Sequence, residues 1–317
     1  MKKLWSWFLN SQEMSLLLVF IILCVITGIL NPVFFTFRNL IVVSRSFSLF
    51  LIIAVLMNFV IILREIDLSV GSVVALSGTV CGLSLVSGLS IPLSIIIGIS
   101  TGTLMGFING FLITRFSIHS FVVTLAMLYA ARGAVYVIGM GRPIYPFPKS
   151  FAILGEGKFL GIPILVFIAL AWVIVGNFFL AKTTYGRAVY AVGGNSETAT
   201  RAGLNVKKIK QWSFLLNGLS AGISGVLLVS RLSVAQPSMG TGWELQIIAA
   251  VVIGGTSLLG GEGTILGTLI GVMFISILNN IMILIRINVY WQNIVVGLIL
   301  ILATILDTVR RRKQLPE

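Results

Sequence analysis

Residues 162–181 read IPILVFIALAWVIVGNFFLA and carry no charged side chain. An α-helix needs roughly 20 apolar residues to cross the hydrocarbon core of a bilayer, and this stretch has that length. We therefore predict that it forms a membrane-spanning helix. The same pattern recurs along the chain, with apolar runs separated by charges, prolines or glycine clusters, and predicts ten spans in all. The predicted spans are residues 14–31, 40–63, 67–88, 91–114, 118–139, 162–181, 212–231, 244–259, 264–285 and 289–309.

The overall composition is also typical of a membrane protein. Of the 317 residues, 57% are hydrophobic and only 10% are charged, whereas about a quarter of the residues in a soluble domain are charged. The mean hydropathy is +1.08, and the 9 acidic residues are too few to cover a water-facing surface. We predict an all-α integral membrane protein in which residues 1–317 form a single transmembrane domain.

The charged residues predict how the chain is oriented. The net charge is +13, but the basic residues lie in short breaks between apolar runs, so we expect no nucleic-acid partner. Basic residues near span ends are retained on the cytoplasmic side. Lys2, Lys3, the cluster at 310–313 and the basic loop at 182–211 therefore place both termini and this loop in the cytoplasm. We expect a multi-pass protein of the inner (plasma) membrane, surrounded by the lipid bilayer.

Two glycine series suggest an internal repeat. Each contains the pattern Gly-Thr-Leu-x-Gly, and the ten-span threading runs the two series in opposite directions across the membrane. Such an arrangement is typical of an inverted-topology repeat, here of five spans plus five. Glycine at every fourth position also lets another helix backbone approach closely, so we predict that these residues pack helices together. The series are Gly98, Gly102 and Gly106, and Gly263, Gly267 and Gly271.

The loop at 182–211 contains a short segment with helix signals. Asn195 or Ser196 can cap a helix from Ser196 to Ala202, Glu197 complements its positive end, and Gly203 can end it in the left-handed conformation. A short helix in a cytoplasmic loop can insert into a cleft of a partner and follow its movement. The alternative is an ordinary solvated basic loop.

Several stretches together resemble one family. They are Tyr185-Gly186-Arg187 with VYAVGGN and AGLNVKKIK after it, IDLSVGSVVALSG from Ile66, IAAVVIGGTSLLGGEGTILGTLIG from Ile248, and WQNIVVGLIL from Trp291. Their order and spacing along most of the chain resemble the ribose-type sugar ABC transporter permeases, in the superfamily of branched-chain amino-acid and monosaccharide permeases.

This resemblance implies a homodimer of permeases, an ABC ATPase subunit on the cytoplasmic side and an extracytoplasmic sugar-binding protein. It also implies which residues couple the permease to the ATPase. The family usually has alanine where this chain has Thr198 and Thr200, and small residues where it has Arg64 and Glu65. The implied coupling residues are Gly194, Asn195, Glu197, Ala199, Arg201 and Gly203.

The residues themselves indicate no chemistry of bond making or breaking. A phosphate-cradling Gly-x4-Gly-Lys-Ser/Thr loop is missing, so we expect ATP and Mg to bind on the partner subunit and no cofactor to bind here. The single histidine, His119, has no acid, cysteine or second histidine at a useful spacing. Cys24 and Cys81 lie inside apolar runs, far from the spacing of a metal site. We predict neither a catalytic nor a metal site.

Polar residues inside the spans are candidates for a transport path. Asn58, Asn109, Asn217 and Asn279 suit a neutral polyol, although hydrogen bonding between helices is the alternative for each. Arg132 is a further polar residue within a span. The acids fall near span ends in this threading, which disfavours a proton-coupled carrier because such a carrier needs buried carboxylates.

The sequence therefore predicts the permease subunit of an ABC importer that moves a pentose or hexose by alternating access. A branched-chain amino-acid or nucleoside ABC permease is one alternative, and an ion-coupled secondary sugar carrier is another. A membrane-embedded enzyme is a third, for which the spans offer no cluster of acids, histidines or metal ligands.

Overall fold

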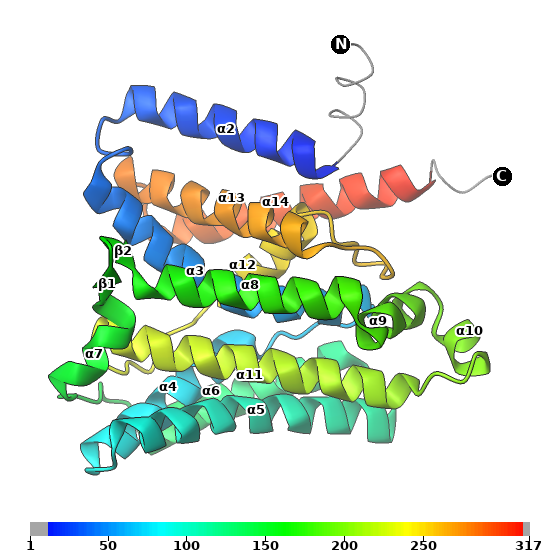
Figure 1. Cartoon of the computed structure of the whole chain (residues 1–317), viewed down its shortest axis with the longest axis horizontal. Helices are drawn as coiled ribbons and strands as arrows, with labels where there is room; N and C mark the ends of the chain where they lie inside the picture. Colours follow the sequence, from blue (N-terminus) through cyan, green and yellow to red (C-terminus); the bar gives the residue numbers. More distant parts are fainter. Residues whose placement is uncertain (1–11, 313–317) are drawn as a thin grey trace.

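The computed structural model describes residues 12–312, which form a bundle of helices with one very short hairpin (Figure 1). A helix is present within each of the ten ranges predicted to span the membrane. These helices are α2 (Gln12–Leu30), α3 (Phe37–Ile62), α4 (Val70–Val86), α5 (Ile91–Phe116), α6 (Ser120–Ile138), α8 (Ile164–Lys182), α11 (Val206–Leu232), α12 (Trp243–Ile253), α13 (Ile265–Leu284) and α14 (Val289–Arg312).

Among the described residues, six of these helices are long and apolar enough to cross a membrane: α3, α5, α6, α8, α11 and α13. The apolar parts of α2, α4, α12 and α14 are shorter, so the count of ten spans stays a prediction. The predicted eighth span, 244–259, is too long. Helix α12 ends at Ile253, because Gly255, Gly260 and Gly261 adopt positive φ angles and turn the chain into a loop.

Helix α3 lies at the centre of the bundle. Every side chain from Leu49 to Ile62 is at most 9% exposed, and the helix packs against α8, α11, α12 and α13. A helix that is apolar on all sides is expected where other helices surround it completely. Helices α8, α11, α12 and α13 therefore surround α3.

Helices α5 and α11 form a close pair through their glycines. A Cβ atom added at Gly102 would lie 2.6 Å from the carbonyl oxygen of Gly218 and 2.6 Å from the Cα of Gly222. At Gly106 an added Cβ would meet the carbonyl oxygen of Phe214. Only hydrogen in place of a side chain permits this approach, which supplies packing contacts where lipid removes the hydrophobic drive between helices.

The neighbours of α3–α6 correspond to those of α11–α14. Helix α4 packs against α5 and α6, as α12 packs against α13 and α14; likewise α5 packs against α11, as α13 packs against α3. Gly267 and Gly271 of α13 approach the backbone of Gly254 and Ala250 at the end of α12. The first glycine series thus lies on α5, and Gly267 and Gly271 of the second lie on the corresponding helix α13. The prediction is wrong for Gly263, which lies in the loop before α13 with φ of 155°.

The two ends of the bundle carry different short elements (Figure 1). At one end lie α7 (Lys149–Glu156) and the hairpin of β1 (Lys158–Phe159) and β2 (Ile162–Pro163), in which Lys158 pairs with Pro163. This hairpin is a small departure from the predicted all-α class. At the other end lie α9 (Thr184–Gly194) and α10 (Ser196–Arg201), and there α2 begins and α14 ends.

Substituting Gly102 with alanine is expected to destabilise the bundle by about 1–3 kcal/mol, because the added methyl group overpacks the contact between α5 and α11. Gly133 on α6 is the matched control, since no atom lies within 4 Å of a Cβ added there. Thermal unfolding in detergent, followed by the monodisperse fraction in size-exclusion chromatography, measures both. Equal unfolding midpoints for Gly102→Ala and Gly133→Ala would contradict the role of the close approach.

Candidate functional site

The segment formed by α9 and α10 lies at one end of the molecule and carries most of the predicted coupling residues. The Asn195 side chain caps α10 by accepting a hydrogen bond from the Thr198 amide at 2.9 Å, and Gly203 follows with φ of 84°. The predicted short helix and its caps are therefore confirmed. Glu197 and Arg201 form an exposed ion pair of 2.7 Å on its outer face.

Most of the predicted coupling residues are exposed, but Ala199 is not. Gly194, Asn195, Glu197, Arg201 and Gly203 are accessible. Ala199 is only 4% exposed and faces the body of the protein. A bulky charge at Ala199 would therefore disturb the packing of α10 as well as any docking. Glu197 and Arg201 are the positions that test docking.

Arg64 holds the end of α9 against the end of α3. Its backbone is left-handed, with φ of 62°, and its guanidinium donates from Nε to the carbonyl oxygen of Gly193 at 2.7 Å and from Nη2 to that of Gly194 at 2.5 Å. A cation at these terminal carbonyls also complements the negative end of the helix dipole. The neighbouring Glu65 is buried and paired with Lys210 on α11. Arg64 and Glu65, the two residues that depart from the family pattern, thus both have hydrogen-bonding partners within the protein.

Backbone groups from three segments of the chain also meet at the end of α3. The Gly261 amide donates to the carbonyl oxygen of Ile62 at 2.9 Å, and a Cβ at Gly193 would collide with that same oxygen. We call this contact the coupling junction: the end of α3 (Ile62–Glu65), Gly193–Gly194 and Gly260–Gly261. It joins the loop after α12 and the α9–α10 segment to the central helix.

Two tyrosines of α9 anchor this segment further. The hydroxyl of Tyr190 donates to the carbonyl oxygen of Gly263 at 2.6 Å. The hydroxyl of Tyr185 lies 2.7 Å from Ser213 Oγ on α11, and burial raises the pKa of Tyr185 to about 12. Since it stays protonated throughout the physiological range, its contact with α11 does not depend on pH there.

Asn109 and Asn217 belong to a buried network around Asp67. This carboxylate is 1% exposed and accepts hydrogen bonds from the Ser69 amide at 2.9 Å, Ser69 Oγ at 2.6 Å and Asn217 Nδ2 at 3.0 Å. Asn109 donates to Ser69 Oγ at 2.9 Å. A substrate contact for these two asparagines stays a prediction, while the structure gives each a partner inside the protein.

The position of Asp67 corrects one expectation. The sequence places it at the end of a span, and α4 does begin just after it, but that helix begins inside the bundle rather than at its surface. A second acid, Glu244 at the start of α12, reaches Gly71 at the start of α4. Arg132 lies on α6 and binds the loop before α12, because it donates to the carbonyl oxygens of Pro237 at 2.8 Å and Met239 at 2.7 Å. Buried carboxylates are therefore present, and their supposed absence is no argument against a proton-coupled carrier.

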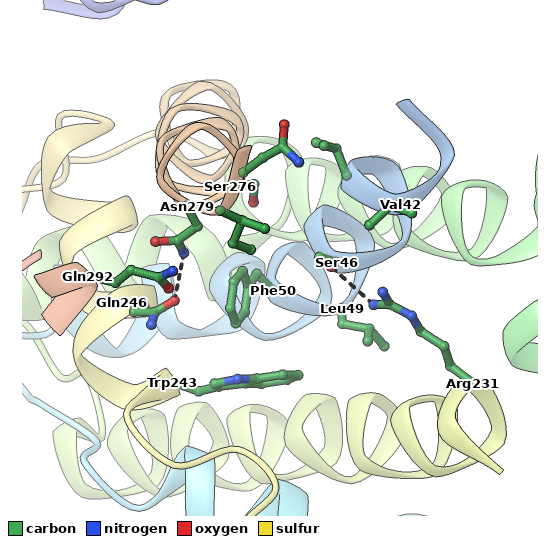
Figure 2. Close-up of a pocket in the computed structure, with 13 residues that line it drawn as sticks. Val42, Ser46, Leu49, Phe50, Arg231, Trp243, Gln246, Ser276, Asn279 and Gln292 are labelled. Atoms are coloured by element: carbon green, nitrogen blue, oxygen red, sulfur yellow. Dashed lines mark hydrogen bonds between the residues drawn. The ribbon is translucent and has the colours of Figure 1, made fainter. Parts of the chain in front are cut away.

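Asn58 and Asn279 differ in what they face. Asn58 is fully buried, and its Oδ1 accepts from Thr256 Oγ1 at 2.9 Å, next to the coupling junction. Asn279 lines a cavity, as Figure 2 shows, and donates to Gln246 Oε1 at 3.0 Å. Of the four predicted asparagines, Asn279 is the one that lines this cavity.

The cavity has a volume of about 250 Å³ and lies between α3, α11, α12, α13 and α14. Its walls are richer in amides and hydroxyls than a lipid-facing surface. Of these polar groups only Asn279 was predicted from the sequence, although Ser276, Asn279 and Asn280 follow a helical spacing that puts polar groups on one face of an apolar helix. The lining residues are Val42, Val43, Ser46, Leu49, Phe50, Arg231, Trp243, Gln246, Ser276, Asn279, Asn280, Ile283 and Gln292.

Comparison with known proteins places the chain in a family. Residues 39–304 match the model of the branched-chain amino acid transport system permease component. The chain belongs to this permease family. The match covers all of the candidate site, from the cavity to the coupling junction, so the expected resemblance is confirmed. It is a multi-pass protein of the inner membrane.

Individual relatives are similar over nearly their whole length. The ribose import permease protein of Haemophilus influenzae is 40% identical over 307 residues, which cover 96% of this chain and 95% of that protein. The L-arabinose ABC transporter permease protein of Azospirillum brasilense is 40% identical over 300 residues, 95% and 88% of the two chains. The autoinducer 2 import system permease protein of an Enterobacter species is 33% identical over 299 residues, 94% and 87%. No solved structure matches the permease.

Replacing Arg64 with alanine is expected to loosen the end of α9. Charge-assisted hydrogen bonds contribute roughly 1.5–3 kcal/mol each, so hydrogen exchange of the amides at 190–195 should accelerate by about tenfold or more. Arg64→Gly loses the same hydrogen bonds but suits the left-handed backbone, and it should be about 1 kcal/mol more stable than Arg64→Ala. Exchange measured by mass spectrometry tests both. Unchanged exchange at 190–195 in both variants would show that Arg64 does not hold α9.

Proposed function

We propose that this permease is the membrane subunit of an ABC importer that carries a monosaccharide across the inner membrane. The observation that carries the proposal is its similarity, over nearly the full chain, to import permeases for ribose and L-arabinose. The polar cavity supports the same class of cargo, because amides and hydroxyls can exchange hydrogen bonds with sugar hydroxyls. The chain itself then performs no catalysis.

The energy would come from an ATPase subunit that docks on the α9–α10 segment and binds ATP and Mg. Exposed Glu197 and Arg201 offer it a charged surface, and the buried contacts of Ala199 keep α10 attached to the permease. Movement of this segment would reach α3 through Arg64 and Gly193. Alternating access then follows if α3 and its neighbours shift around the cavity.

The same proposal includes ten spans in two inverted halves, with both termini and the α9–α10 segment in the cytoplasm. Support comes from the corresponding neighbours of α3–α6 and α11–α14, and from the basic residues in the loop that holds α9 and α10. A second permease copy would complete the translocation path. The opposite end, with α7 and the hairpin, would then meet the sugar-binding protein.

The buried carboxylate of Asp67 favours one second candidate, an ion-coupled sugar carrier that works alone. Buried acids in membrane proteins often mark proton paths. Here the carboxylate already accepts three hydrogen bonds from Ser69 and Asn217. Those bonds fit a structural anion that holds the start of α4, and they lead us to prefer the importer.

Uptake of labelled sugars into proteoliposomes separates these candidates. We expect D-ribose, L-arabinose or another monosaccharide to enter only when the permease is combined with its ATPase, its sugar-binding protein and ATP on the ATPase side. Uptake by the permease alone under a proton or sodium gradient would instead make it a secondary carrier. ATP-driven uptake of branched-chain amino acids or nucleosides, with sugars refused, would keep the mechanism and change the cargo.

Reversing the charge of Glu197 tests the docking surface. Because the side chains of this ion pair are at least 75% exposed, Glu197→Lys should leave folding nearly unchanged. We expect ATP-driven uptake to fall by about tenfold, which corresponds to roughly 1.4 kcal/mol of lost docking energy.

The control for this test is the double variant Glu197→Arg with Arg201→Glu. It keeps an ion pair within α10 but exchanges the two charges on the docking surface. Uptake should stay low in the double variant if binding of the partner depends on which charge stands at each position. Full recovery would mean that the ion pair serves only the stability of α10.

A further inference from the structure

The cavity between α3, α11, α12, α13 and α14 lies toward the end of the bundle opposite the coupling junction. Its α3 residues, Val42 to Phe50, come from the first half of a helix whose other end forms that junction. Arg45, on the same part of α3, donates to the carbonyl oxygen of Glu156 at the end of α7. In the proposed orientation, the cavity thus faces the side from which cargo would arrive.

Its walls are rich in hydrogen-bonding groups and, in the part of the chain that the structure describes, carry a single charged side chain, the Arg231 guanidinium. Four amides, two hydroxyls and one guanidinium contribute, and among the described residues no carboxylate lines it. Arg231 Nη1 donates to Ser46 Oγ at 3.1 Å. Amides both donate and accept, so this set matches a ligand whose hydroxyls also do both. The polar lining residues are Ser46, Arg231, Gln246, Ser276, Asn279, Asn280 and Gln292.

Two of these groups have no partner within the described residues. Ser276 Oγ and Asn279 Oδ1 are both buried and accept or donate no hydrogen bond there, although Asn279 uses its Nδ2 to reach Gln246. Ser276 is 6% exposed. Buried polar atoms are nearly always satisfied in native proteins. Unsatisfied atoms on a cavity wall are available for hydrogen bonds to water or to a bound solute with hydroxyls.

An aromatic surface closes the other side. Figure 2 shows the Trp243 indole lying across the cavity, with the amides of Gln246, Asn279 and Gln292 at one end and Arg231 at the other. Phe50 packs edge-on against Trp243, with ring centroids 4.7 Å apart and an angle of 74°. A ligand pocket commonly combines such an apolar wall with a few fixed polar groups. Phe50 covers part of the indole face, so the carbon-bound hydrogens of a sugar ring would meet the part that stays open, and its hydroxyls would meet the opposing amides.

We propose that this cavity binds one neutral monosaccharide in transit, stacked on Trp243 and hydrogen-bonded by Gln246, Asn279 and Ser276. A volume of about 250 Å³ equals that of roughly eight liquid water molecules, which is enough for a single sugar ring. The inference rests on the proposed function in taking a sugar as the cargo. It adds the place where the permease itself contacts that sugar.

The test uses the reconstituted complex and the variants Gln246→Leu, Asn279→Leu and Trp243→Leu. We expect the number of sugars moved per ATP hydrolysed to fall roughly fivefold for each lost hydrogen bond. ATP hydrolysis itself should persist, since the coupling junction is untouched. Trp243→Phe keeps an aromatic wall and should recover much of the ratio. Trp291→Leu is the matched control, because Trp291 is exposed on α14 and does not line the cavity.

A second measurement is equilibrium binding of labelled D-ribose and L-arabinose to the permease alone in lipid nanodiscs. Weak binding that Gln246→Leu and Trp243→Leu abolish, with Trp291→Leu unchanged, supports the site. The anionic polyol D-gluconate serves as competitor; if it displaces the label better than unlabelled ribose, the assignment of a neutral ligand is wrong.

The outcomes separate the two proposals. If the unmodified complex moves no sugar under ATP, the proposed function fails. If it does move sugar, but all three cavity variants fold, bind as the unmodified permease does and keep its ratio of sugar to ATP, only the cavity assignment fails. Folding is checked by monodispersity and thermal unfolding, and a misfolded leucine variant is replaced by Gln246→Met or by Trp243→Phe with Asn279→Ser.

Discussion

Within a bilayer, every backbone amide and carbonyl must find a partner inside the protein, because lipid offers none. This constraint explains where the charged residues of the permease lie. Polar side chains bind the backbone just before α4 and before α12: Asp67 binds the amide of Ser69, and Arg132 binds the carbonyls of Pro237 and Met239. At the end of α9, Arg64 performs the same role for Gly193. Polar groups that look like candidates for chemistry thus first satisfy backbone groups where helices begin or end.

The same constraint sets what the sequence could and could not predict. Hydropathy located all ten apolar helices, since a run of apolar residues is a local property, and Asn195 and Gly203 defined α10 by equally local rules. Depth is not local. The sequence shows Asp67 at a helix start, but only the packing of α4 against α5 and α11 puts that start in the interior. The end of α12 was missed because glycine suits both close helix packing and turns, and here Gly255, Gly260 and Gly261 form a loop. The cavity combines five helices, so only Asn279 could be foreseen.

Helix α3 links the two candidate sites. It carries Ser46 and Phe50 on the cavity wall, Asn58 beside the loop after α12, and Ile62 and Arg64 at the coupling junction. Its second half is buried on all sides, so it cannot bend independently of its neighbours without opening voids in the core. A displacement applied at the junction is therefore expected to move the cavity wall as one body with α3. Arg64 matters more than its exposed position suggests, because it connects a surface segment to this central helix.

A transporter must bind its cargo weakly enough to release it, and the chemistry of the cavity suits that requirement. Neutral hydrogen bonds to amides contribute little net free energy, since the sugar gives up similar bonds to water. The wall also contains few charges, and Arg231 already donates to Ser46. Selection of the cargo can then rest with a separate binding protein, while the cavity needs only to replace water around any sugar of the right size. On this view, the unpaired oxygens of Ser276 and Asn279 are useful because they favour entry of a hydroxyl-rich solute without making its release slow.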